Sequence, residues 1–532
     1  MNFSSLKLPY QSTGFYSRLV TDYISQAQQL QPFYSFAPTT EGIKKAIASR
    51  KKYNSNRQAL VEVLTKQYAA VDTTEAVKNN INALLSPNTF TITTAHQPNI
   101  FTGPLYFIYK ILHAVKLAAA CKNVSPENNF VPVYYMGSED ADLDELGHIF
   151  INGQKQQWQT DQTGAVGRMK VDKALIQLID TIAGQVLVHP FGDAIIQLMK
   201  DCYQDDITIE QATFKMVNHL FGEYGVLVIL PDNADLKRLF IPVVEKELHE
   251  AFSHEQVGLT VSSFPGEYKV QASGRELNLF YLKDNRRDRI EMESTKYKVH
   301  DTTLVFTKEE IIEELHQHPE RFSANVILRP VFQETILPNI AFIGGGGEIA
   351  YWLELKKVFE AVHVPYPVLV VRNSFMITER EEAKKISKLK FSIADLFKTE
   401  QDLINGLVKR ESQLQLGLEK EQQALKEIYQ KLKTISGAVD VTLANHTEAL
   451  QAKALQKIAA LEKKMLRAEK KKFEAEQRQL HKLRTVLFPN NNLQERVENL
   501  LLFYAKWGDG FIQSIYENSL ALEQEFVVLE QA

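Results

Sequence analysis

Cysteine is nearly absent from this sequence of 532 residues: only Cys121 and Cys202 occur, far apart and in no CxxC pattern. This scarcity excludes a disulfide framework and a zinc site built from thiolates, and it fits a reducing compartment. No apolar run approaches the roughly 18 residues of a membrane span, and the first residues lack the apolar stretch of a signal peptide. We therefore expect a cytoplasmic protein with no membrane partner.

A dominant charge of either sign is also missing, since 61 lysines and arginines face 65 aspartates and glutamates, for a formal net charge of −4. A protein that binds nucleic acid normally carries a basic field, so we expect no nucleic-acid partner. Hydrophobic residues make up 44% of the chain and charged residues 24%, which is the balance of a folded globular protein with a substantial core.

From Thr89 onward, short apolar runs alternate with amphipathic helical patterns. The runs predict strands at 89–95, 130–137, 225–231, 325–332, 339–344 and 366–373. The patterns between them predict helices at 105–122, 209–224, 234–253 and 348–362. Because the strands are continuous apolar runs separated by helices, we expect an α/β fold whose mostly parallel sheet is covered on both faces.

The chain divides into four predicted parts: an N-terminal helical segment packing on the core (1–88), the sheet core (89–377), a helical hairpin (378–490) and C-terminal helices packing on the core (491–532). The core pattern is interrupted near 145–205 and 255–325 by hairpin-like sequences with charged turns. We interpret these two stretches as β-rich insertions near the ligand-binding face of the sheet.

The hairpin region is highly charged and carries apolar residues at alternating spacings of three and four. They are Ile404, Leu407, Leu414, Leu418, Leu425, Ile428, Leu432 and Ile435, with Glu411 and Glu421 at the polar breaks. The stretch "SGAVDVTLANH" (436–446) then supplies Gly437 and other turn residues before a second apolar helix that includes Leu450. This pattern predicts an antiparallel coiled-coil hairpin that serves as a rigid arm or a homodimer contact.

The first candidate site is the stretch "AHQPNIFTGPLYFIYK", in which a strand ends at His96 and a helix begins soon after. Asn99 or Thr102 can cap that helix, and Gly103 lets a ligand approach the backbone closely. Free N–H groups at a helix start suit an anion, and Lys110 lies about two turns further on. An ordinary capped helix explains the same residues equally well.

The second candidate is "YYMGSEDADLDELGH", in which five acids lie within seven residues after a strand. Such carboxylates can hold a substrate ammonium or Mg²⁺, or act as a general base. Acids favoured by the dipole of a starting helix are the alternative, but capping needs fewer, so we interpret Glu139, Asp140 and Asp142 as functional. Asp144 and His148 could share a helix face, but they lack a third ligand, and no metal site is predicted.

The third candidate is a run of four glycines between a strand and a helix: Gly344, Gly345, Gly346 and Gly347. Glycine permits positive φ and close approach of a ligand, although a flexible turn is the alternative. Glu348 at the helix start would repel a phosphate, so an amine or a sugar hydroxyl is the expected ligand. Tyr351 and Trp352 follow on the helix and can form the wall of a pocket.

Polar residues also occupy two further strand ends, with Arg329 and Gln333 near one and Arg372 and Ser374 after the other. An arginine there suits a carboxylate or phosphate in bidentate geometry, and a salt bridge at a domain edge is an equal alternative. The carboxyl ends of parallel strands face one crevice. We therefore predict one pocket that binds a phosphorylated ligand and an amino acid together.

Four motifs occur in the order "FTGPLYFIYK", "SED", "LRPVFQETILPNIAFIGGGGEIAYW" and "PVLVVRNS". Together they resemble the BshC family, the cysteine-adding enzymes of bacillithiol biosynthesis, and the resemblance covers nearly the whole chain. Two departures affect the local backbone shape: "GGGGE" stands where many relatives have "GGPGE", and "AHQPN" lacks an expected glycine before the His or Gln.

The resemblance implies a Rossmann-like core with two inserted subdomains and a C-terminal coiled-coil dimerisation arm. It also implies a ligase that adds L-cysteine to glucosaminyl-malate in the last step of bacillithiol biosynthesis. The cysteine carboxyl group cannot react without activation, so ATP and Mg²⁺ are hypothesised, through an acyl-adenylate or an acyl-phosphate. The alternatives are a nucleotidylyltransferase-like enzyme of the same fold with another acceptor, and a non-catalytic coiled-coil scaffold.

Within this hypothesis, the predicted nucleotide-binding residues are His96, Asn99, Thr102, Gly103 and Lys110. Catalysis is assigned to Glu139 and Asp140, which would hold the cysteine ammonium or deprotonate the amine, together with His96. The predicted substrate-binding residues are Asp142, Arg329, Gln333, Gly344, Gly345, Gly346, Gly347, Glu348, Tyr351, Trp352, Arg372 and Ser374.

Overall fold

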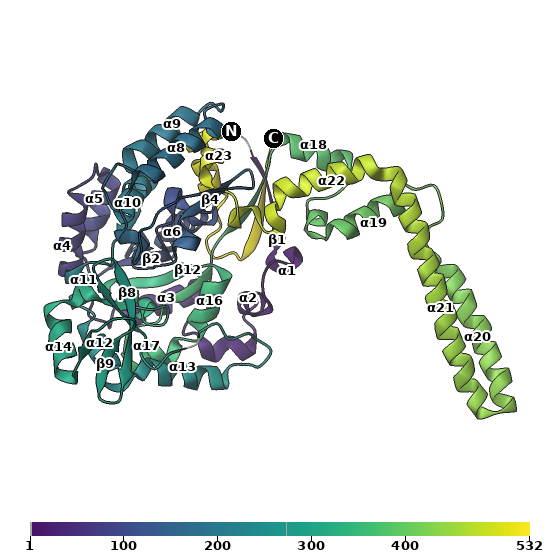
Figure 1. Cartoon of the computed structure of the whole chain (residues 1–532), viewed down its shortest axis with the longest axis horizontal. Coiled ribbons are helices and arrows are strands. Elements are labelled where there is room, and N and C mark those ends of the chain that lie inside the picture. The colour runs from purple at the N-terminus through teal and green to yellow at the C-terminus, as the bar shows by residue number, and fades with distance from the viewer. Residues whose placement is uncertain (1–2, 273) are drawn as a thin grey trace. The chain divides into compact units, whose positions relative to one another are not determined.

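The structure is a computed structural model that describes residues 3–272 and 274–532. It divides into two compact units, one formed by residues 1–377 and 492–532 and the other by residues 378–491. Figure 1 labels their helices and strands. Among the described residues, no helix has both the length and the apolar character needed to cross a lipid bilayer.

The centre of the first unit is a five-stranded sheet with the order β13-β12-β2-β3-β6, in which all neighbouring strands are parallel. The strands are β2 (Thr89–His96), β3 (Asn129–Met136), β6 (Leu227–Ile229), β12 (Asn339–Gly344) and β13 (Val368–Val371). Nearly all of their residues are buried. The predicted α/β class with a parallel sheet is therefore confirmed, and five of the six predicted strands are present.

The sixth predicted strand, at 325–332, is wrong. This segment is a turn followed by the helix α15 (Arg329–Ile336). Pro330 lies in the first turn of α15, where its fixed φ suits a helix start. A short apolar run can be a buried strand or a buried helix, and its periodicity alone does not distinguish the two. Arg329 and Gln333 consequently lie on a helix and not at a strand end.

The strand order reverses between β2 and β12, and this reversal creates a crevice. The chain passes from β2 through α6 (Tyr106–Val124) to β3 on one side. It passes from β12 through α16 (Gly346–Leu353) and α17 (Lys356–Ala361) to β13 on the other side. Figure 1 shows α6 and α16 on opposite sides of β12. Ligands of open α/β sheets bind at such a switch point, beyond the carboxyl ends of the strands.

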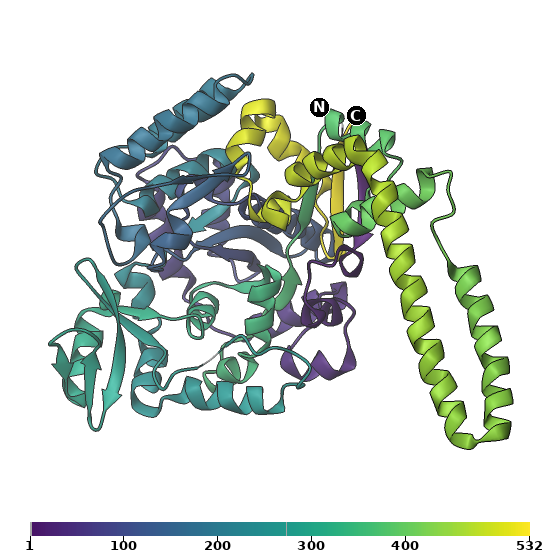
Figure 2. The same cartoon turned by 45° about the vertical axis from the view of Figure 1, so that its right-hand side comes forward.

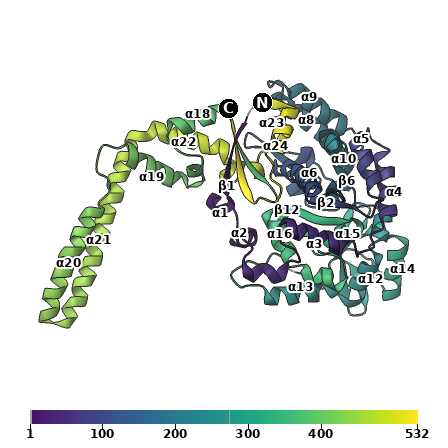
Figure 3. The same cartoon turned by 180° about the vertical axis from the view of Figure 1, so that it is seen from behind.

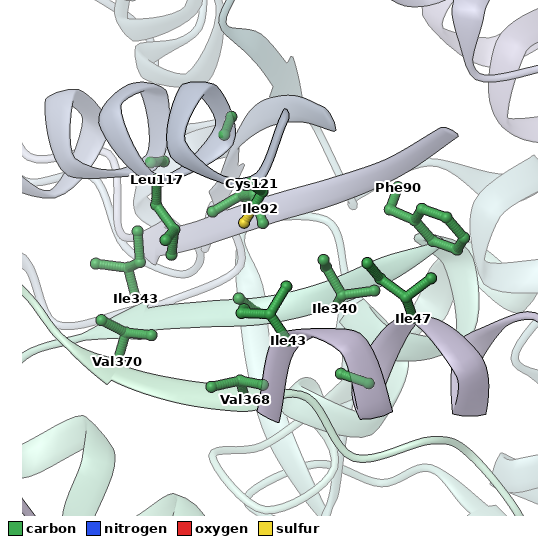
Figure 4. Close-up of a cluster of buried hydrophobic side chains, with 14 residues drawn as sticks. Ile43, Ile47, Phe90, Ile92, Leu117, Cys121, Ile340, Ile343, Val368 and Val370 are labelled. Carbon is green, nitrogen blue, oxygen red and sulfur yellow. The ribbon is translucent and has the colours of Figure 1, made fainter. Parts of the chain in front are cut away.

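The two faces of the sheet are packed by different helices. Ile43 and Ile47 of α3 (Thr40–Arg50) and Leu117 of α6 join side chains of β2, β12 and β13 in one buried cluster, seen in Figure 4. Successive strand residues point to opposite faces, so Phe342 of β12 faces away from that cluster. Its ring stacks on Trp352 of α16 with a centroid distance of 4.3 Å. This packing fixes the start of α16 beside the sheet edge.

The first insertion begins as predicted, with a hairpin of β4 (His148–Ile151) and β5 (Gln154–Gln157). Its second half is not β-rich, because it forms α8 (Lys173–Val186) and α9 (Gly192–Cys202). The Asp172 side chain caps α8 by accepting a hydrogen bond from the Leu175 N–H. Apolar residues at helical spacing and an Asp cap are the signals of a helix start, and the hairpin interpretation overlooked them.

The second insertion contains the predicted β-structure. Its antiparallel sheet has the order β10-β9-β8-β7-β11, and Figure 2 shows it at one edge of the unit. The strands are β7 (Leu279–Lys283), β8 (Arg286–Glu293), β9 (Lys296–Val299), β10 (Val305–Phe306) and β11 (Phe322–Ala324). Two helices accompany them, α13 (Phe252–Ser263) and α14 (Lys308–Gln317).

Several shorter elements complete this unit. A third sheet has the order β1-β15-β14, formed by β1 (Phe3–Pro9), β15 (Glu525–Gln531) and β14 (Ser374–Thr378). The helical interpretation of the N-terminal segment missed β1. The helices are α2 (Arg18–Ile24), α4 (Arg57–Tyr68), α5 (Glu75–Ala83), α10 (Ile209–Phe221), α11 (Ala234–Arg238), α12 (Ile241–Glu250), α23 (Leu500–Trp507) and α24 (Asp509–Asn518). The predicted helix 234–253 is divided, because Pro242 starts a new helix at α12.

The second unit contains the predicted antiparallel hairpin, formed by α20 (Glu419–Val439) and α21 (Val441–Lys470) and visible in Figure 3. It also contains α18 (Arg380–Lys388), α19 (Glu400–Glu411) and α22 (Glu474–Leu487). The predicted seam is not one helix, because α19 ends at Glu411 and residues 412–418 form a loop. Gly417 in that loop disfavours helix. The turn lies at Asp440, which caps α21 and falls within the predicted turn stretch 436–446.

Candidate functional site

A cavity of about 310 Å³ lies at the predicted edge of the parallel sheet. Its lining comes from the ends of β2 (Ala95, His96, Gln97), β3 (Tyr135, Gly137) and β12 (Phe342, Gly345, Gly346, Gly347, Glu348), with Arg372 after β13. Helices and loops add Tyr106, Lys110, Glu145, Val326, Arg329, Pro330, Gln333, Tyr351, Trp352 and Arg496. The structure therefore brings His96, three of the four glycines and Arg372 together at one crevice, at a volume suited to a small molecule. Gly344 and Glu139, which were expected there too, do not line it.

The cavity has an excess of positive charge. Four cationic side chains line it, from Lys110, Arg329, Arg372 and Arg496, against two carboxylates from Glu145 and Glu348. Cations that converge in a poorly solvated cleft raise the local concentration of anions. Carboxylates of the protein pair closely with some of these cations and leave others without a full counter-charge. This difference identifies the cations that a ligand can bind.

Lys110 and Glu348 neutralise each other. The Lys110 side chain is 2% exposed, forms an ion pair with Glu348 and donates to the Ala95 carbonyl oxygen at 2.8 Å. Glu348 also accepts a hydrogen bond from the Gly345 N–H at 2.8 Å, which caps α16. The expected contact of Glu348 with an amine or sugar hydroxyl stays a prediction, but its carboxylate already satisfies this lysine and this helix start.

Arg372 is held by the C-terminal segment of the chain. Its guanidinium pairs with Glu495 at 2.7 Å, and the two side chains are 4% and 0% exposed. It also donates to the Ser374 hydroxyl at 3.1 Å and lies over the Tyr106 ring. The contacts of Arg372 therefore match the salt-bridge alternative better than a role as an unpaired receptor for a substrate carboxylate. Ser374 supports Arg372 from outside the cavity lining.

Arg329 and Asp140 form a looser pair at the rim. Arg329 Nη1 lies 3.9 Å from Asp140 Oδ2, and both side chains are partly exposed. Gln97 donates to the same carboxylate oxygen at 3.1 Å. Burial alone would raise the pKa of Asp140, but Arg329 and the Gln97 hydrogen bond outweigh it and lower that pKa. Asp140 therefore stays ionised at neutral pH, although it does not itself line the cavity.

His96 is the buried titratable group of the cavity that has no protein partner for its Nε2 atom. Its ring packs against Tyr106 and Phe107, with centroid distances of 5.3 and 5.5 Å. Burial is the main cause that holds the pKa of His96 well below its usual value, and the charges of nearby cations, Lys110 among them, lower it further. The imidazole is therefore neutral at physiological pH, with a ring nitrogen available to a ligand or a proton.

The glycine run works by close packing and not by positive φ, because none of the four glycines has a left-handed backbone. A Cβ atom on Gly346 would lie 2.9 Å from the Val20 side chain, whereas one on Gly347 would meet nothing within 4 Å. Gly344 ends β12 and Gly345 caps α16. The run thus lets α2 approach α16 and leaves an open surface beside the cavity.

Three predicted nucleotide-binding residues lie outside the cavity lining: Asn99, Thr102 and Gly103. The prediction that Asn99 or Thr102 caps α6 is wrong, because α6 begins at Tyr106 with no side-chain cap. The preceding segment makes a separate short turn, in which Thr102 has a positive φ of 72°. Asn499 donates to the Gly103 carbonyl oxygen and holds this turn away from the cavity.

Glu139 belongs to a neighbouring buried charge cluster. Its carboxylate pairs with Lys237, which also contacts Asp232 at 3.1 Å. Arg168 binds Asp232 through two hydrogen bonds of 2.6 and 2.8 Å, and Ser323 donates to Glu139 at 3.2 Å. Glu139 does not line the main cavity. A catalytic role for Glu139 stays a prediction, but this geometry directs its carboxylate toward the cluster.

The remaining predicted residues are in mixed positions. Asp142 caps the short helix α7 (Leu143–Leu146), as the dipole alternative suggested. Gln333 lines the cavity but donates to Glu334 at 2.9 Å. Tyr351 and Trp352 line it as predicted, and the Trp352 Nε1 atom is buried without a hydrogen-bond partner.

Sequence reasoning missed five lining residues with polar side chains: Gln97, Tyr106, Tyr135, Glu145 and Arg496. Gln97 follows His96 directly, and its place at a strand end was an available signal. Arg496 comes from the distant C-terminal segment, and no local pattern indicates that it reaches the sheet edge. Tertiary contacts alone bring it there.

The parts of the chain that the structure describes contain no preformed metal site and no reactive thiol. No group of three or more His, Cys, Asp or Glu side chains there is arranged to hold a metal ion. His148 Nδ1 instead contacts the Asp144 backbone carbonyl at 2.7 Å. Cys121 and Cys202 are free and buried, and burial raises the pKa of each thiol to about 12, so neither is a reactive thiolate.

Comparison with known proteins gives a consistent result over the whole chain. A family model described as the bacillithiol biosynthesis BshC N-terminal Rossmann-like domain matches residues 1–373, and one for the BshC C-terminal coiled-coil domain matches residues 375–531. A relative from Flavobacterium johnsoniae, named "Putative cysteine ligase BshC", is 38% identical over 98% of this chain and 99% of its own length. Relatives of the same name from Christiangramia forsetii and Bacillus cereus are 38% and 25% identical, over 98% and 100% of both chains.

A solved structure from Campylobacter jejuni, named as a putative arginyl-tRNA synthetase, covers 85% of this chain and all of its own. Its sequence identity is 11% and its TM-score is 0.22. A score this low carries no argument about fold or function.

Proposed function

Because this chain belongs to the BshC family of bacillithiol biosynthesis, we propose that it is a ligase that joins L-cysteine to glucosaminyl-malate through an amide bond. The carrying observation is the cation-rich cavity at the strand-order reversal, in which a buried histidine has a free ring nitrogen. Both proposed substrates bear carboxylates, which suit such a cavity. The proposal places the reaction in the cytoplasm, where free thiols such as those of this chain persist.

The reaction forms a bond between the sugar amine nitrogen and the cysteine carboxyl carbon, and it breaks a carbon–oxygen bond of that carboxyl group, whose oxygen would leave with AMP or phosphate after activation by ATP. The attacking amine must lose a proton. His96 is the proposed acceptor, because its imidazole is neutral and lines the cavity. Binding of an anionic substrate would offset the nearby cations and raise the pKa of His96 toward a value suited to a general base.

Asp140 has a positioning role in this proposal. Its ionised carboxylate fixes the Gln97 amide and faces Arg329, and both of these side chains line the cavity. Arg329 keeps donors free for a substrate carboxylate, since its separation of 3.9 Å from Asp140 is long for a hydrogen bond. A Cβ atom at Gly137 would lie 3.0 Å from Arg329 Nη1, so a larger residue there would displace this guanidinium by a few tenths of an ångström.

ATP and Mg²⁺ remain part of the proposal as the source of activation of the cysteine carboxylate. The residues present fit an oxyanion such as a phosphate: Arg329 has free donors, and the buried His96 Nε2 and Trp352 Nε1 atoms lack partners. The described residues contain no prepared cluster of metal-ligating side chains. Mg²⁺ would therefore enter with the nucleotide and not through a resident site.

The test is product formation measured by mass spectrometry. The purified protein is incubated with cysteine, glucosaminyl-malate, Mg²⁺ and ATP, and a parallel sample omits ATP. The expected result is an ATP-dependent amide product, and the appearance of AMP or ADP identifies the route of activation. His96→Gln is expected to abolish most of the product, whereas His219→Gln, an exposed histidine of α10, is the matched control. Unchanged turnover in His96→Gln would refute the assigned base.

We further propose that the second unit forms a homodimer contact. Four apolar side chains of α20 recur at spacings of four, three and four, and all are exposed: Ile428, Leu432, Ile435 and Val439. None of the residues of α20 is buried in the single chain. This heptad spacing is that of a coiled-coil seam, and a second copy of the chain would cover it.

The dimer is tested by light scattering after size-exclusion chromatography. Ile435→Glu introduces a charge into the exposed seam and is expected to shift the protein toward monomer. Gln430→Glu adds the same charge five residues earlier on α20, outside the apolar seam, and should leave the molecular mass in solution unchanged. A dimer that persists in Ile435→Glu at all concentrations would contradict a contact through this seam.

A further inference from the structure

Arg496 differs from the other three cations of the cavity. Lys110 pairs with Glu348, Arg372 with Glu495, and Arg329 faces Asp140. The guanidinium of Arg496 has no hydrogen-bond or ion-pair partner within residues 3–272 and 274–532, and the side chain is exposed. It is thus a cation that lines a cavity without a compensating group from the protein.

The position of Arg496 is nevertheless well defined by its neighbours. Gln494 accepts a hydrogen bond from the Ile377 N–H at 2.9 Å, and Glu495 accepts one from the Phe375 N–H at 3.0 Å. Both N–H groups belong to β14, so the backbone before Arg496 is fixed to the sheet. Burial is the main cause of the lowered pKa of Lys110, and the positive charge of Arg496 lowers it further. The arginine therefore lies within electrostatic range of the cavity floor.

A second cavity of about 480 Å³ adjoins the first. The two share three lining residues: Gly346, Gly347 and Arg496. The second cavity is otherwise lined by residues 15–20 and by part of the segment 267–271, together with Ala350. Its charged side chains are Arg18, Lys269, Arg496 and Glu267. Arg18 faces Asp22 at 3.3 Å on the surface, so the positive charges left for a ligand are those of Lys269 and Arg496.

We propose that this second cavity extends the substrate site, and that Arg496, at its junction with the first, binds an oxyanion of the acceptor substrate. The planar guanidinium matches a carboxylate or a phosphate with two parallel hydrogen bonds. The identification of this oxyanion as a carboxylate of the malate part rests on the proposed function. The amine of the same acceptor then lies in the first cavity, beside His96.

Binding of L-malate and of inorganic phosphate, each measured by titration calorimetry, tests this assignment. Arg496→Gln is expected to weaken malate binding roughly 10- to 100-fold, the effect of losing a charged hydrogen-bond donor. Arg238→Gln removes an exposed arginine of α11 that lines neither cavity and should bind malate like the unaltered protein. Thermal denaturation of both variants checks that each is folded.

Two results would overturn the inference. Equal malate binding by Arg496→Gln and the unaltered protein would remove Arg496 from the site. Arg496-dependent binding of phosphate without malate binding would overturn the assignment to the acceptor. Lys269→Glu changes the second cavity alone and is expected to weaken malate binding, whereas unchanged binding in this variant would exclude that cavity.

The inference and the proposed function can fail separately. Malate binding requires no ligation, so Arg496-dependent binding without any amide product would overturn the activity and leave the subsite intact. Ligation with an unchanged KM for glucosaminyl-malate in Arg496→Gln would overturn the subsite and leave the activity intact. An increase in that KM with an unchanged KM for cysteine is the result that the inference predicts.

Discussion

Two adjacent glycines at the start of α16 should respond in opposite ways to the same substitution. Gly346 and Gly347 both line the two cavities, but the space around them differs. A methyl group on Gly346 would lie 2.9 Å from the Val20 Cγ2 atom of α2. A methyl group on Gly347 would meet no protein atom within 4 Å and would point into open space.

The magnitudes follow from packing and helix propensity. Overpacking a filled site costs about 1 to 3 kcal/mol, and Val20 is 2% exposed with a stiff β-branched side chain that cannot easily move away. Replacing a helical glycine by alanine contributes roughly 0.5 to 1 kcal/mol of stability. The free energy of unfolding should therefore fall by about 1 to 2 kcal/mol in Gly346→Ala. In Gly347→Ala it should stay unchanged or rise slightly.

Thermal denaturation and steady-state ligation kinetics measure the two effects. The denaturation midpoint should fall for Gly346→Ala and stay level or rise for Gly347→Ala. The KM for glucosaminyl-malate should rise in Gly347→Ala, because the added methyl group narrows the junction of the two cavities. Equal stability of the two variants would refute the packing argument, and an unaltered KM in Gly347→Ala would refute the placement of the acceptor.

Three further substitutions test individual contacts. Glu495→Gln leaves the buried Arg372 guanidinium uncompensated, so thermal denaturation should reveal a loss of about 3 to 5 kcal/mol, and a loss below 1 kcal/mol would contradict the pairing. Burial lowers the pKa of His113 to about 4, so the unfolded chain binds a proton at this residue before the folded protein does, and stability falls as the pH drops below about 6.5. His96, whose pKa is also lowered, adds to this loss. Urea unfolding should therefore show that His113→Gln loses about 2 kcal/mol less than the unaltered protein from pH 7 to pH 5, and an equal loss would contradict this assignment. Asp140→Asn removes the anion opposite Arg329 and should lower kcat/KM for ligation by roughly tenfold, with normal activity as the contradicting result.

The sequence was sufficient to predict the sheet edge because the signals there are local. The segments ending at His96 and Gly344 are apolar runs that stop at polar or glycine residues, and both are strands of the central sheet. Parallel pairing then places their carboxyl ends together. The segment 325–332 carries a similar apolar run, yet it leads into a helix, because a proline in a first helical turn and one in an edge strand look alike in a short window.

The pairing of charges could not be predicted from the sequence. Glu139 and Lys237 are far apart along the chain, and their ion pair exists only because the turn after β3 approaches α11 in the fold. Arg372 likewise finds Glu495 in the C-terminal segment. The local sequence can predict that an acid or an arginine lies at a strand end. Tertiary structure determines whether another side chain of the protein or a ligand neutralises its charge.

The thiol content of cells tests the central claim most directly, because the cell supplies any activating cofactor. In a bacillithiol-producing bacterium that lacks its own copy of this protein, expression of the chain should restore bacillithiol and remove accumulated glucosaminyl-malate, both measured by mass spectrometry. The variant His219→Gln should do the same, and His96→Gln, at an equal protein level, should not. Full restoration of bacillithiol by His96→Gln, or an undiminished thiol pool without the chain, would contradict the proposed cysteine ligation in this cavity.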